Sequence, residues 1–342
     1  MILHVTTKTG GYDVTVRRGA LCDRQSFNVP RGGKTLIVTD DGVPERYVKA
    51  VAAHFETPVP VTLPQGERSK SFENYALLLR TLTEHGFTRH DKAVAVGGGV
   101  VGDLCGFAAA TYMRGIAFYN VPTTFLSQVD SSIGGKTAID FCGVKNVVGA
   151  FYPPAAVIAD PDVLKTLSAR QLHAGVAESV KMAVTGDEDL FSLLEQSALS
   201  PEEFDKNAEE IIIKSLRFKK AVVESDPEEK GLRKVLNFGH TAGHAIESEY
   251  GGTLLHGECV ALGMLPLCSP EIRPRLSALL ARYDLPVRVA FSPEKMAALI
   301  SHDKKAEGKD DLISVVYADG IGKYTFRKAS VSEIVRACEE IL

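Results

Sequence analysis

The sequence predicts an α/β protein: an N-terminal domain with a parallel, Rossmann-like sheet, and a C-terminal domain that is mainly α-helical. Apolar β-rich runs alternate with helical patterns in the first half, and helical patterns dominate the second half. Such alternation is typical of a parallel sheet covered by helices. The chain has 342 residues, more than one ordinary domain, and we expect one domain over residues 1–158 and another over 159–342.

Four short runs in the first half are the expected strands of the sheet. Each is apolar with β-branched or aromatic residues, and each ends at a turn signal: Asp-Asp-Gly, three glycines, a proline, or Asp-Pro. They are residues 34–39, 93–96, 116–121 and 156–159. A helical pattern such as residues 71–85 lies between two of them, so strands and helices alternate as a parallel sheet requires.

Helix start signals mark the second half. Ser168 with Gln171, and Ser200 with Glu203, have the spacing of capping boxes, in which side chains satisfy free N–H groups of the first turn. A proline follows Ser200 at the first helical position, and the helix that it opens is expected to run to about residue 224. Residues 312–318 and 323–327 flank Asp-Gly and are expected to form a hairpin.

Composition and charge exclude several classes of protein. The chain is 45% apolar with a net charge of −4, which argues against a surface for nucleic acid or anionic membranes. No window reaches the roughly 20 apolar residues of a membrane span, and the N-terminus lacks a signal-peptide pattern. Six scattered cysteines without a CxxC pair fit reduced thiols, so a soluble cytoplasmic protein is expected.

The first of two glycine-rich turns, residues 97–102, satisfies GxGxxG after an expected strand. Free N–H groups at the start of the following helix favour a pyrophosphate there. A dinucleotide fingerprint has an acid about 20 residues later, but here the next acid after Asp103 is Asp130. Asp40, at the end of the preceding strand, is an alternative partner for an adenosine. A tight turn without a ligand remains the other interpretation.

The second glycine-rich turn, residues 131–137, is close to a phosphate-binding P-loop. It fails that pattern because Asp130 stands where the first glycine belongs, so ATP chemistry is not expected. Lys136 is then either a functional cation in a glycine-flanked loop or a solvated loop lysine.

A polar stripe in the second half is the main candidate for chemistry. Arg233, Asn237, His240 and His244 follow spacings of four, three and four, which places them on one face if residues 233–247 are helical. Two histidines four residues apart indicate either a metal or catalytic site or an ordinary structural role, and the spacing favours neither interpretation. A catalytic zinc ion takes three protein ligands from histidines and carboxylates. His256 and Glu178, with Lys181 three residues later, are candidate partners that spacing alone cannot bring together.

Seven segments recur in this order in one known family. They are GGGVVGD, VPTTFLSQVDSSIGGKTAID, KNVVGAFYPP, AGVAESVKMA, LNFGHTAGHAIE, LLHGE and DKK. From Val38 to Val316 the chain therefore resembles the 3-dehydroquinate synthases. The resemblance implies an NAD-binding α/β domain, a mainly helical domain that binds metal and substrate, and an active site in the cleft between them. It also implies NAD⁺ and one divalent metal ion per subunit, Zn²⁺ or Co²⁺, as cofactors, and a homodimer.

The resemblance also assigns roles to individual positions. The implied metal ligands are Glu178, His240 and His256. The implied NAD contacts are Asp40, Glu67, Lys70, Gly98, Gly99, Val100, Asp103, Thr123, Thr124, Lys145, Val163, Leu164, Lys165 and Thr166. The implied substrate contacts are Asp130, Lys136, Asn146, Lys181, Lys219, Arg233, Asn237, His244, one of Lys304 and Lys305, and Arg114 reaching in from the neighbouring subunit. The implied catalytic residues are Glu229, His244, Lys136, Lys181 and Asn237. Ala174 departs from the family, since some members have asparagine there.

The implied reaction converts 3-deoxy-D-arabino-heptulosonate 7-phosphate to 3-dehydroquinate and phosphate, a step of the shikimate pathway to aromatic amino acids. Oxidation at C5, phosphate elimination, reduction and aldol closure follow one another. A glycerol-dehydrogenase-like enzyme has no use for the implied carboxylate clamp of Lys219 and Arg233, and a sedoheptulose 7-phosphate cyclase acts on a substrate without that carboxylate. A degenerate nucleotide-binding protein would have lost a metal ligand or an active-site lysine, and none is lost here.

Overall fold

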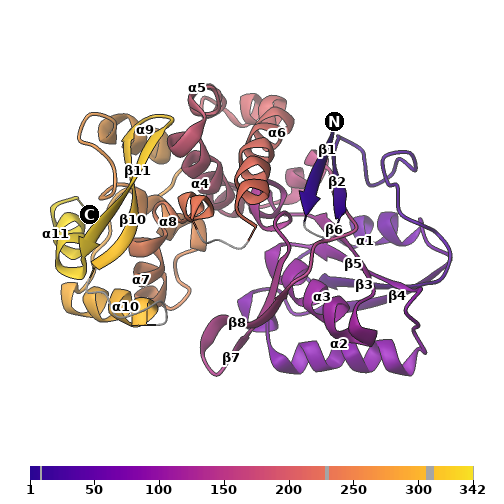
Figure 1. Ribbon diagram of the computed structural model, residues 1–342. Coiled ribbons are helices and arrows are strands. Elements are labelled where there is room, and N and C mark those ends of the chain that lie inside the picture. Colours follow the sequence, from indigo (N-terminus) through magenta and orange to yellow (C-terminus); the bar gives the residue numbers. More distant parts are fainter. Residues whose placement is uncertain (8–9, 228–230, 306–311, 342) are drawn as a thin grey trace. The chain divides into compact units, whose positions relative to one another are not determined.

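A computed structural model describes residues 1–7, 10–227, 231–305 and 312–341. The chain forms two compact units, Met1–Leu167 and Ser168–Leu342 (Figure 1). The expected boundary after residue 158 lies within the last strand of the first unit, β9 (Ala156–Ala159). That unit continues to Leu167 because the next turn, η4 (Pro161–Thr166), places Val163 in its core.

A seven-stranded sheet forms the centre of the first unit, in the order β1-β2-β9-β6-β5-β3-β4. β1 and β2 are antiparallel, and the other neighbours are parallel. The bounds are β1 Ile2–Thr7, β2 Gly10–Val16, β3 Lys34–Asp40, β4 Thr57–Leu63, β5 Lys92–Gly97 and β6 Ala117–Pro122. The predicted fold class is confirmed, although the sequence did not indicate β1, β2 or β4.

Both faces of the central strands β3 and β5 are buried, which explains their continuous apolar runs. In β5, Ala93 and Ala95 pack into one core cluster while Val94 and Val96 pack into another, because successive side chains of a strand point to opposite faces. One cluster includes residues of α2 (Phe72–Glu84) and α3 (Gly99–Thr111), and the other includes α1 (Glu45–Ala52).

A separate hairpin of β7 (Lys136–Phe141) and β8 (Val144–Phe151) belongs to the first unit. Cys142 and Gly143 join its strands, and both have positive φ, as a two-residue hairpin turn requires. The hairpin exposes several large apolar side chains, those of Phe141, Val144, Val147 and Phe151.

The second unit is mainly helical, as predicted. Its elements are α4 Ala169–Gly186, α5 Glu188–Ser197, α6 Pro201–Ser225, η5 Leu232–Asn237, α7 His240–Tyr250, α8 His256–Met264, α9 Arg273–Arg282, α10 Pro293–Lys305, β10 Leu312–Gly320, β11 Lys323–Ser330 and α11 Val331–Ile341. The hydroxyls of Ser168 and Ser200 cap α4 and α6, and β10 and β11 form the expected hairpin. Within the described residues, we find no helix with the length and apolarity needed to span a membrane.

Residues 233–247 do not form the single helix that would place the polar stripe on one face. η5 ends at Asn237, and α7 begins only at His240. Gly239 lies between them with a φ of 78°, a left-handed conformation that glycine adopts without strain. The interpretation of the polar stripe as one continuous helical face is therefore wrong, because Arg233 and Asn237 belong to a different element from His240 and His244.

Candidate active site

Helix α4 carries a buried ion pair at the centre of the second unit. Glu178 and Lys181 stand three residues apart, and both are 1% exposed. The Lys181 ammonium contacts Glu178 Oε2. Charged groups are seldom fully buried unless they are paired or bind an ion, so this carboxylate is a candidate for function.

Two histidines from other helices approach the same carboxylate. His240 begins α7 and His256 begins α8, and their Nε2 atoms lie 3.7 Å and 3.3 Å from Glu178 Oε1. Glycines let the two helices approach closely. A Cβ atom on Gly263 of α8 would lie 2.0 Å from the carbonyl oxygen of Gly239, which directly precedes α7.

The three side chains fit a divalent metal ion. Their ligand atoms all lie within 4.8 Å of one another. Apart from the ion pair of Oε2 with Lys181, neither oxygen of Glu178 has a hydrogen-bond partner among the described residues, which is unusual for a buried carboxylate. A bound cation would satisfy both, and two imidazoles with one carboxylate are a normal zinc donor set.

A second group of potential ligands shares one member with the first. It consists of His244, Glu247 and His256, of which His244 is exposed. The rings of His240, His244 and His256 have centroids 5.2 to 5.9 Å apart, so the three imidazoles form one cluster.

The electrostatics keep two of the three predicted ligands ready to bind a cation. Burial raises the pKa of Glu178, but the Lys181 ammonium and the two imidazoles outweigh it and hold that pKa well below the ordinary value. Burial and the Lys181 charge lower the pKa of His240 to about 3. Burial also lowers the pKa of His256, yet Glu178 and Glu247 more than offset this and raise it to about 10. Without a cation, His256 therefore carries the charge that balances the carboxylates.

Two further cations of the second unit are buried at predicted substrate positions. Lys219 of α6 is 7% exposed and Arg233 of η5 is 3% exposed. Arg233 Nη1 donates to the Pro227 carbonyl at 2.9 Å, and its backbone N–H donates to Asp226 Oδ2 at 3.0 Å, which orients η5. Asn237 and His244 are exposed. Glu229 and the side chains of Lys304 and Lys305 lie outside the described residues.

The first unit brings the predicted cofactor positions to the end of β5. Gly98 caps α3, and Gly99 and Val100 form its first turn. A Cβ atom on Gly98 would lie 3.1 Å from the Thr124 side chain, and one on Gly99 3.0 Å from the Ser131 side chain, so a larger residue at either position would crowd these neighbours. The Thr123 N–H donates to the Gly97 carbonyl at 2.9 Å.

The remaining predicted cofactor positions follow other strands of the sheet. Asp40 ends β3, and burial raises its pKa. Glu67 begins η1 (Glu67–Ser69), and Lys70 directly follows the last residue of η1. The last group lies in the η4 turn after β9, and consists of Val163, Leu164, Lys165 and Thr166. All of these positions follow strands of the one sheet.

A hydrogen-bonded network joins predicted cofactor and substrate positions within the first unit. Lys70 is 5% exposed; its ammonium lies 2.5 Å from Asp103 Oδ2 and contacts Asn146 Oδ1. Asp140 Oδ1 accepts from the Asn146 N–H at 2.8 Å, and the Asp140 N–H donates to the Lys70 carbonyl at 2.8 Å. Asp140 thus holds Asn146, whose φ is 56°, in its turn. The sequence showed no sign of this role. Lys145, next to Asn146, is exposed.

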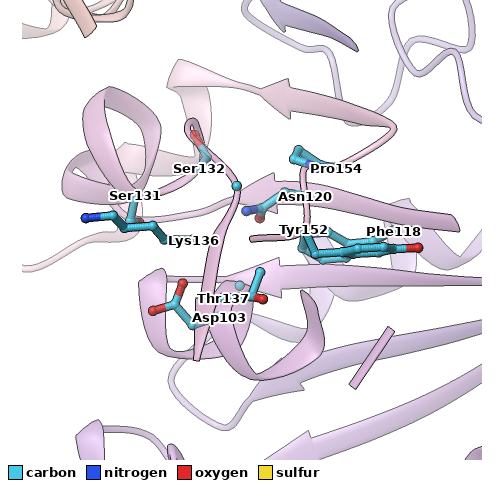
Figure 2. A pocket seen from close by; sticks show the side chains of 11 residues that line it. Asp103, Phe118, Asn120, Ser131, Ser132, Lys136, Thr137, Tyr152 and Pro154 are labelled. Atoms are coloured by element: carbon cyan, nitrogen blue, oxygen red, sulfur yellow. The ribbon is translucent and has the colours of Figure 1, made fainter. Parts of the chain in front are cut away.

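Part of the loop that carries Asp130 and Lys136 lines a small cavity: Figure 2 shows Ser131, Ser132 and Lys136 there, together with side chains of other elements such as Asn120 and Tyr152. Asp130 lies in a π-helical turn, Ser127–Ser131, and Lys136 begins β7 after two glycines with positive φ. The cavity measures about 10 Å³, which is room for one water molecule. Asn120 Oδ1 and the hydroxyls of Ser131 and Ser132 are buried without a hydrogen-bond partner among the described residues, so the surroundings are polar enough to bind it.

The remaining predicted substrate residue of this unit is Arg114. It is exposed and has a φ of 66°, next to Met113 with a φ of 50°. Two consecutive non-glycine residues in this region are uncommon, and such strain occurs often at functional sites.

Comparison with known families gives two adjoining matches. Residues 60–174 match the model of the 3-dehydroquinate synthase N-terminal domain, and residues 175–306 match that of the C-terminal domain. A 3-dehydroquinate synthase of Enterococcus faecalis is 42% identical over 352 residues, covering 98% of this chain and 97% of that protein. One from Latilactobacillus sakei is 39% identical, covering 97% and 96%.

Solved structures agree with the fold and with the chemistry of the site. A 2-deoxy-scyllo-inosose synthase complexed with carbaglucose-6-phosphate, NAD⁺ and Co²⁺ is 26% identical, covers 100% of both chains and has a TM-score of 0.89. A 2-epi-5-epi-valiolone synthase from Streptomyces hygroscopicus with NAD⁺ and Zn²⁺ bound is 27% identical, covers 96% of both chains and has a TM-score of 0.88. A probable glycerol dehydrogenase from Sinorhizobium meliloti, at 16% identity and a TM-score of 0.62, shares the fold alone.

Proposed function

This chain belongs to the 3-dehydroquinate synthase family, and we propose that it is a phosphate-eliminating lyase of aromatic amino acid biosynthesis. It converts 3-deoxy-D-arabino-heptulosonate 7-phosphate to 3-dehydroquinate and phosphate. The reaction oxidises C5, eliminates phosphate, reduces C5 again and closes the ring by an aldol step. NAD⁺ would supply a reversible hydride acceptor, and a divalent metal ion a Lewis acid that lowers the pKa of the hydroxyl to be oxidised.

The observation that carries this proposal is the buried carboxylate of Glu178. It has no hydrogen-bond partner among the described residues, and two imidazoles approach it. We therefore assign Glu178, His240 and His256 as the metal ligands in the second unit. Lys181 neutralises Glu178 in the metal-free chain and can instead donate to a substrate hydroxyl.

The substrate carries a carboxylate and a phosphate, so its site needs fixed positive charge although the chain as a whole is negative. Lys219 and Arg233 are the proposed carboxylate clamp, since they are buried and a guanidinium binds both oxygens of a carboxylate. Asn237 is assigned to the substrate hydroxyls, and His244 with Glu229 to proton transfer. Lys304 and Lys305 stay candidates for the phosphate.

In the first unit we propose that the start of α3 receives the pyrophosphate of NAD⁺. Gly98, Gly99 and Val100 present backbone N–H groups there, and helix N-termini favour anions. The Lys70 ammonium and the Asp103 carboxylate offer further polar contacts at the same end of the sheet. Lys136, Asn146 and Asp130 are assigned to the substrate, the first two to its phosphate.

We also propose a cytoplasmic homodimer in which Arg114 serves the neighbouring active site. The strained, exposed backbone at Met113 and Arg114 supports this, because it presents a long cation away from its own unit's core. The β7–β8 hairpin of the first unit also exposes apolar side chains, and these support a contact with a second subunit at this hairpin. All six cysteines are free thiols, which suits a reducing compartment.

One experiment separates this function from that of an ordinary dehydrogenase. Substoichiometric NAD⁺ should support many rounds of phosphate release, absorbance of NADH should not rise in proportion to product, and deuterium at C5 should remain in the dehydroquinate. A one-to-one yield of NADH with product would make the chain a dehydrogenase. Faster phosphate release from sedoheptulose 7-phosphate than from the heptulosonate would make it a different cyclase.

A further inference from the structure

The two ring nitrogens of His256 face different carboxylates. Nε2 lies 3.3 Å from Glu178 Oε1, on the side of the proposed metal ion. Nδ1 lies 3.0 Å from Glu247 Oε2, within hydrogen-bonding distance. A neutral imidazole has one N–H and one lone pair, so the hydrogen bond at one nitrogen determines which nitrogen can bind a cation.

The structure fixes the position of Glu247 as firmly as that of the proposed ligands. Glu247 lies on α7 two turns after His240, and residues at this spacing share a helix face. α7 and α8 touch backbone to backbone, since a Cβ atom on Gly243 would lie 2.9 Å from the Cys259 carbonyl oxygen. The distance between Glu247 and His256 is therefore set by two helices in direct contact.

We propose that Glu247 is a positioning residue for the metal centre. Its carboxylate accepts the Nδ1–H of His256, holds the ring in one tautomer and directs the Nε2 lone pair toward the ion held with Glu178 and His240. Carboxylate–histidine–metal arrangements of this kind orient the ligand and make it more basic. The inference deepens the proposed function and rests on its metal site.

A competing interpretation makes Glu247 a ligand itself, together with His244 and His256. The observations favour the positioning role. Glu178 is 1% exposed, its Oε2 contacts the Lys181 ammonium, and its Oε1 faces the two imidazoles without a hydrogen bond; an ion bound only by the competing set would leave Oε1 so. In addition, His244 is exposed. The two interpretations predict different metal contents and different Co²⁺ spectra for a variant that lacks the Glu247 carboxylate.

The test measures Zn²⁺ affinity by competition with a chelator, together with the visible absorption spectrum of the Co²⁺-loaded protein. Glu247→Ala should bind Zn²⁺ about ten- to a hundredfold more weakly while still taking up one ion per subunit. Its Co²⁺ spectrum should keep the wild-type band positions. Glu247→Gln should restore most of the affinity, because its amide oxygen still accepts from Nδ1–H. It also serves as the second variant should the alanine variant fold poorly.

Matched controls make each outcome decisive. Glu249→Ala removes a carboxylate from the same helix, one that accepts from the Ser292 N–H, and should leave Zn²⁺ affinity unchanged. Loss of stoichiometric metal in Glu247→Ala with a shifted Co²⁺ spectrum would make Glu247 a ligand and overturn the inference. Wild-type affinity in Glu247→Ala would also overturn it. Full metal content in His256→Ala would instead overturn the metal site of the proposed function.

Discussion

Replacing Gly263 by alanine should disrupt the metal centre although Gly263 is not itself a proposed ligand. A Cβ atom there would lie 2.0 Å from the carbonyl oxygen of Gly239, whereas real Cβ atoms essentially never come within 3.0 Å of a heavy atom. α8 must therefore move away from the start of α7 by at least about 1 Å, because backbone atoms cannot rotate away as a side chain can. His256 begins α8 and His240 begins α7, so the shift separates two proposed ligands.

The magnitude follows from the tolerance of metal sites. Distances between a metal ion and its ligand atoms vary by only about 0.2 Å, so a ligand displaced by about 1 Å can no longer bind well. We therefore expect Zn²⁺ binding to weaken by more than about a hundredfold, which exceeds the effect of losing a hydrogen bond to a ligand. Overpacking should lower the free energy of unfolding by about 1–3 kcal/mol. Chelator competition and denaturant titration measure the two effects separately.

The control for Gly263→Ala is Gly32→Ala. A Cβ atom on Gly32 would have no neighbour within 4 Å, so metal affinity and stability should stay near those of the wild type. Wild-type Zn²⁺ affinity in Gly263→Ala would refute the reasoning, because it would mean that the spacing of the two helices does not set the ligand geometry.

Two further predictions concern the substrate and the stability of the first unit. Arg233→Ala should weaken binding of the heptulosonate by about 2–5 kcal/mol, and an analogue without the carboxylate far less; equal losses for both in inhibition assays would contradict the clamp. Burial raises the pKa of Asp91, but hydrogen bonds from Thr88 and Lys34 outweigh it and leave the pKa lowered. Asp91 therefore stabilises the fold above the unfolded-state pKa of about 4, and this contribution is lost as the pH falls through the lower folded-state pKa. Asp91→Asn should cost about 1–3 kcal/mol in urea titrations at pH 7 and progressively less below about pH 4, and a pH-independent difference would contradict this.

The fold class and most elements that the sequence predicted depend on local patterns. The strand ending at Gly97 is apolar on both faces, and the structure buries both. Ser168 and Ser200 accept backbone N–H groups three residues later, as the capping spacing predicts. These features involve residues a few positions apart, so their physics can be found in the sequence alone. The strands β1, β2 and β4 were missed because many of their side chains are exposed, so they lack the continuous apolar runs of the central strands.

For the site, the sequence by itself determined the residue types, and the resemblance to a family supplied their grouping. Spacing alone could not bring Glu178 to His240 and His256, since that proximity depends on how α4, α7 and α8 pack. The stripe that joined Arg233 to His244 on one helix was wrong, because Gly239 is left-handed and separates η5 from α7, which the spacing of the polar residues did not reveal.

Only the tertiary structure decided the supporting contacts. Glu247 follows His240 at helical spacing, so extending the stripe by one turn would have included it. Its partner, however, is the outer nitrogen of His256 on another helix. Asp140 likewise contacts only backbone groups of Asn146 and Lys70, so the residue types at those two positions do not reveal the contacts. The identity of a side chain shows which groups it can bind. Which groups it actually meets depends on how helices and strands pack, and glycines and small side chains allow those elements to come close together.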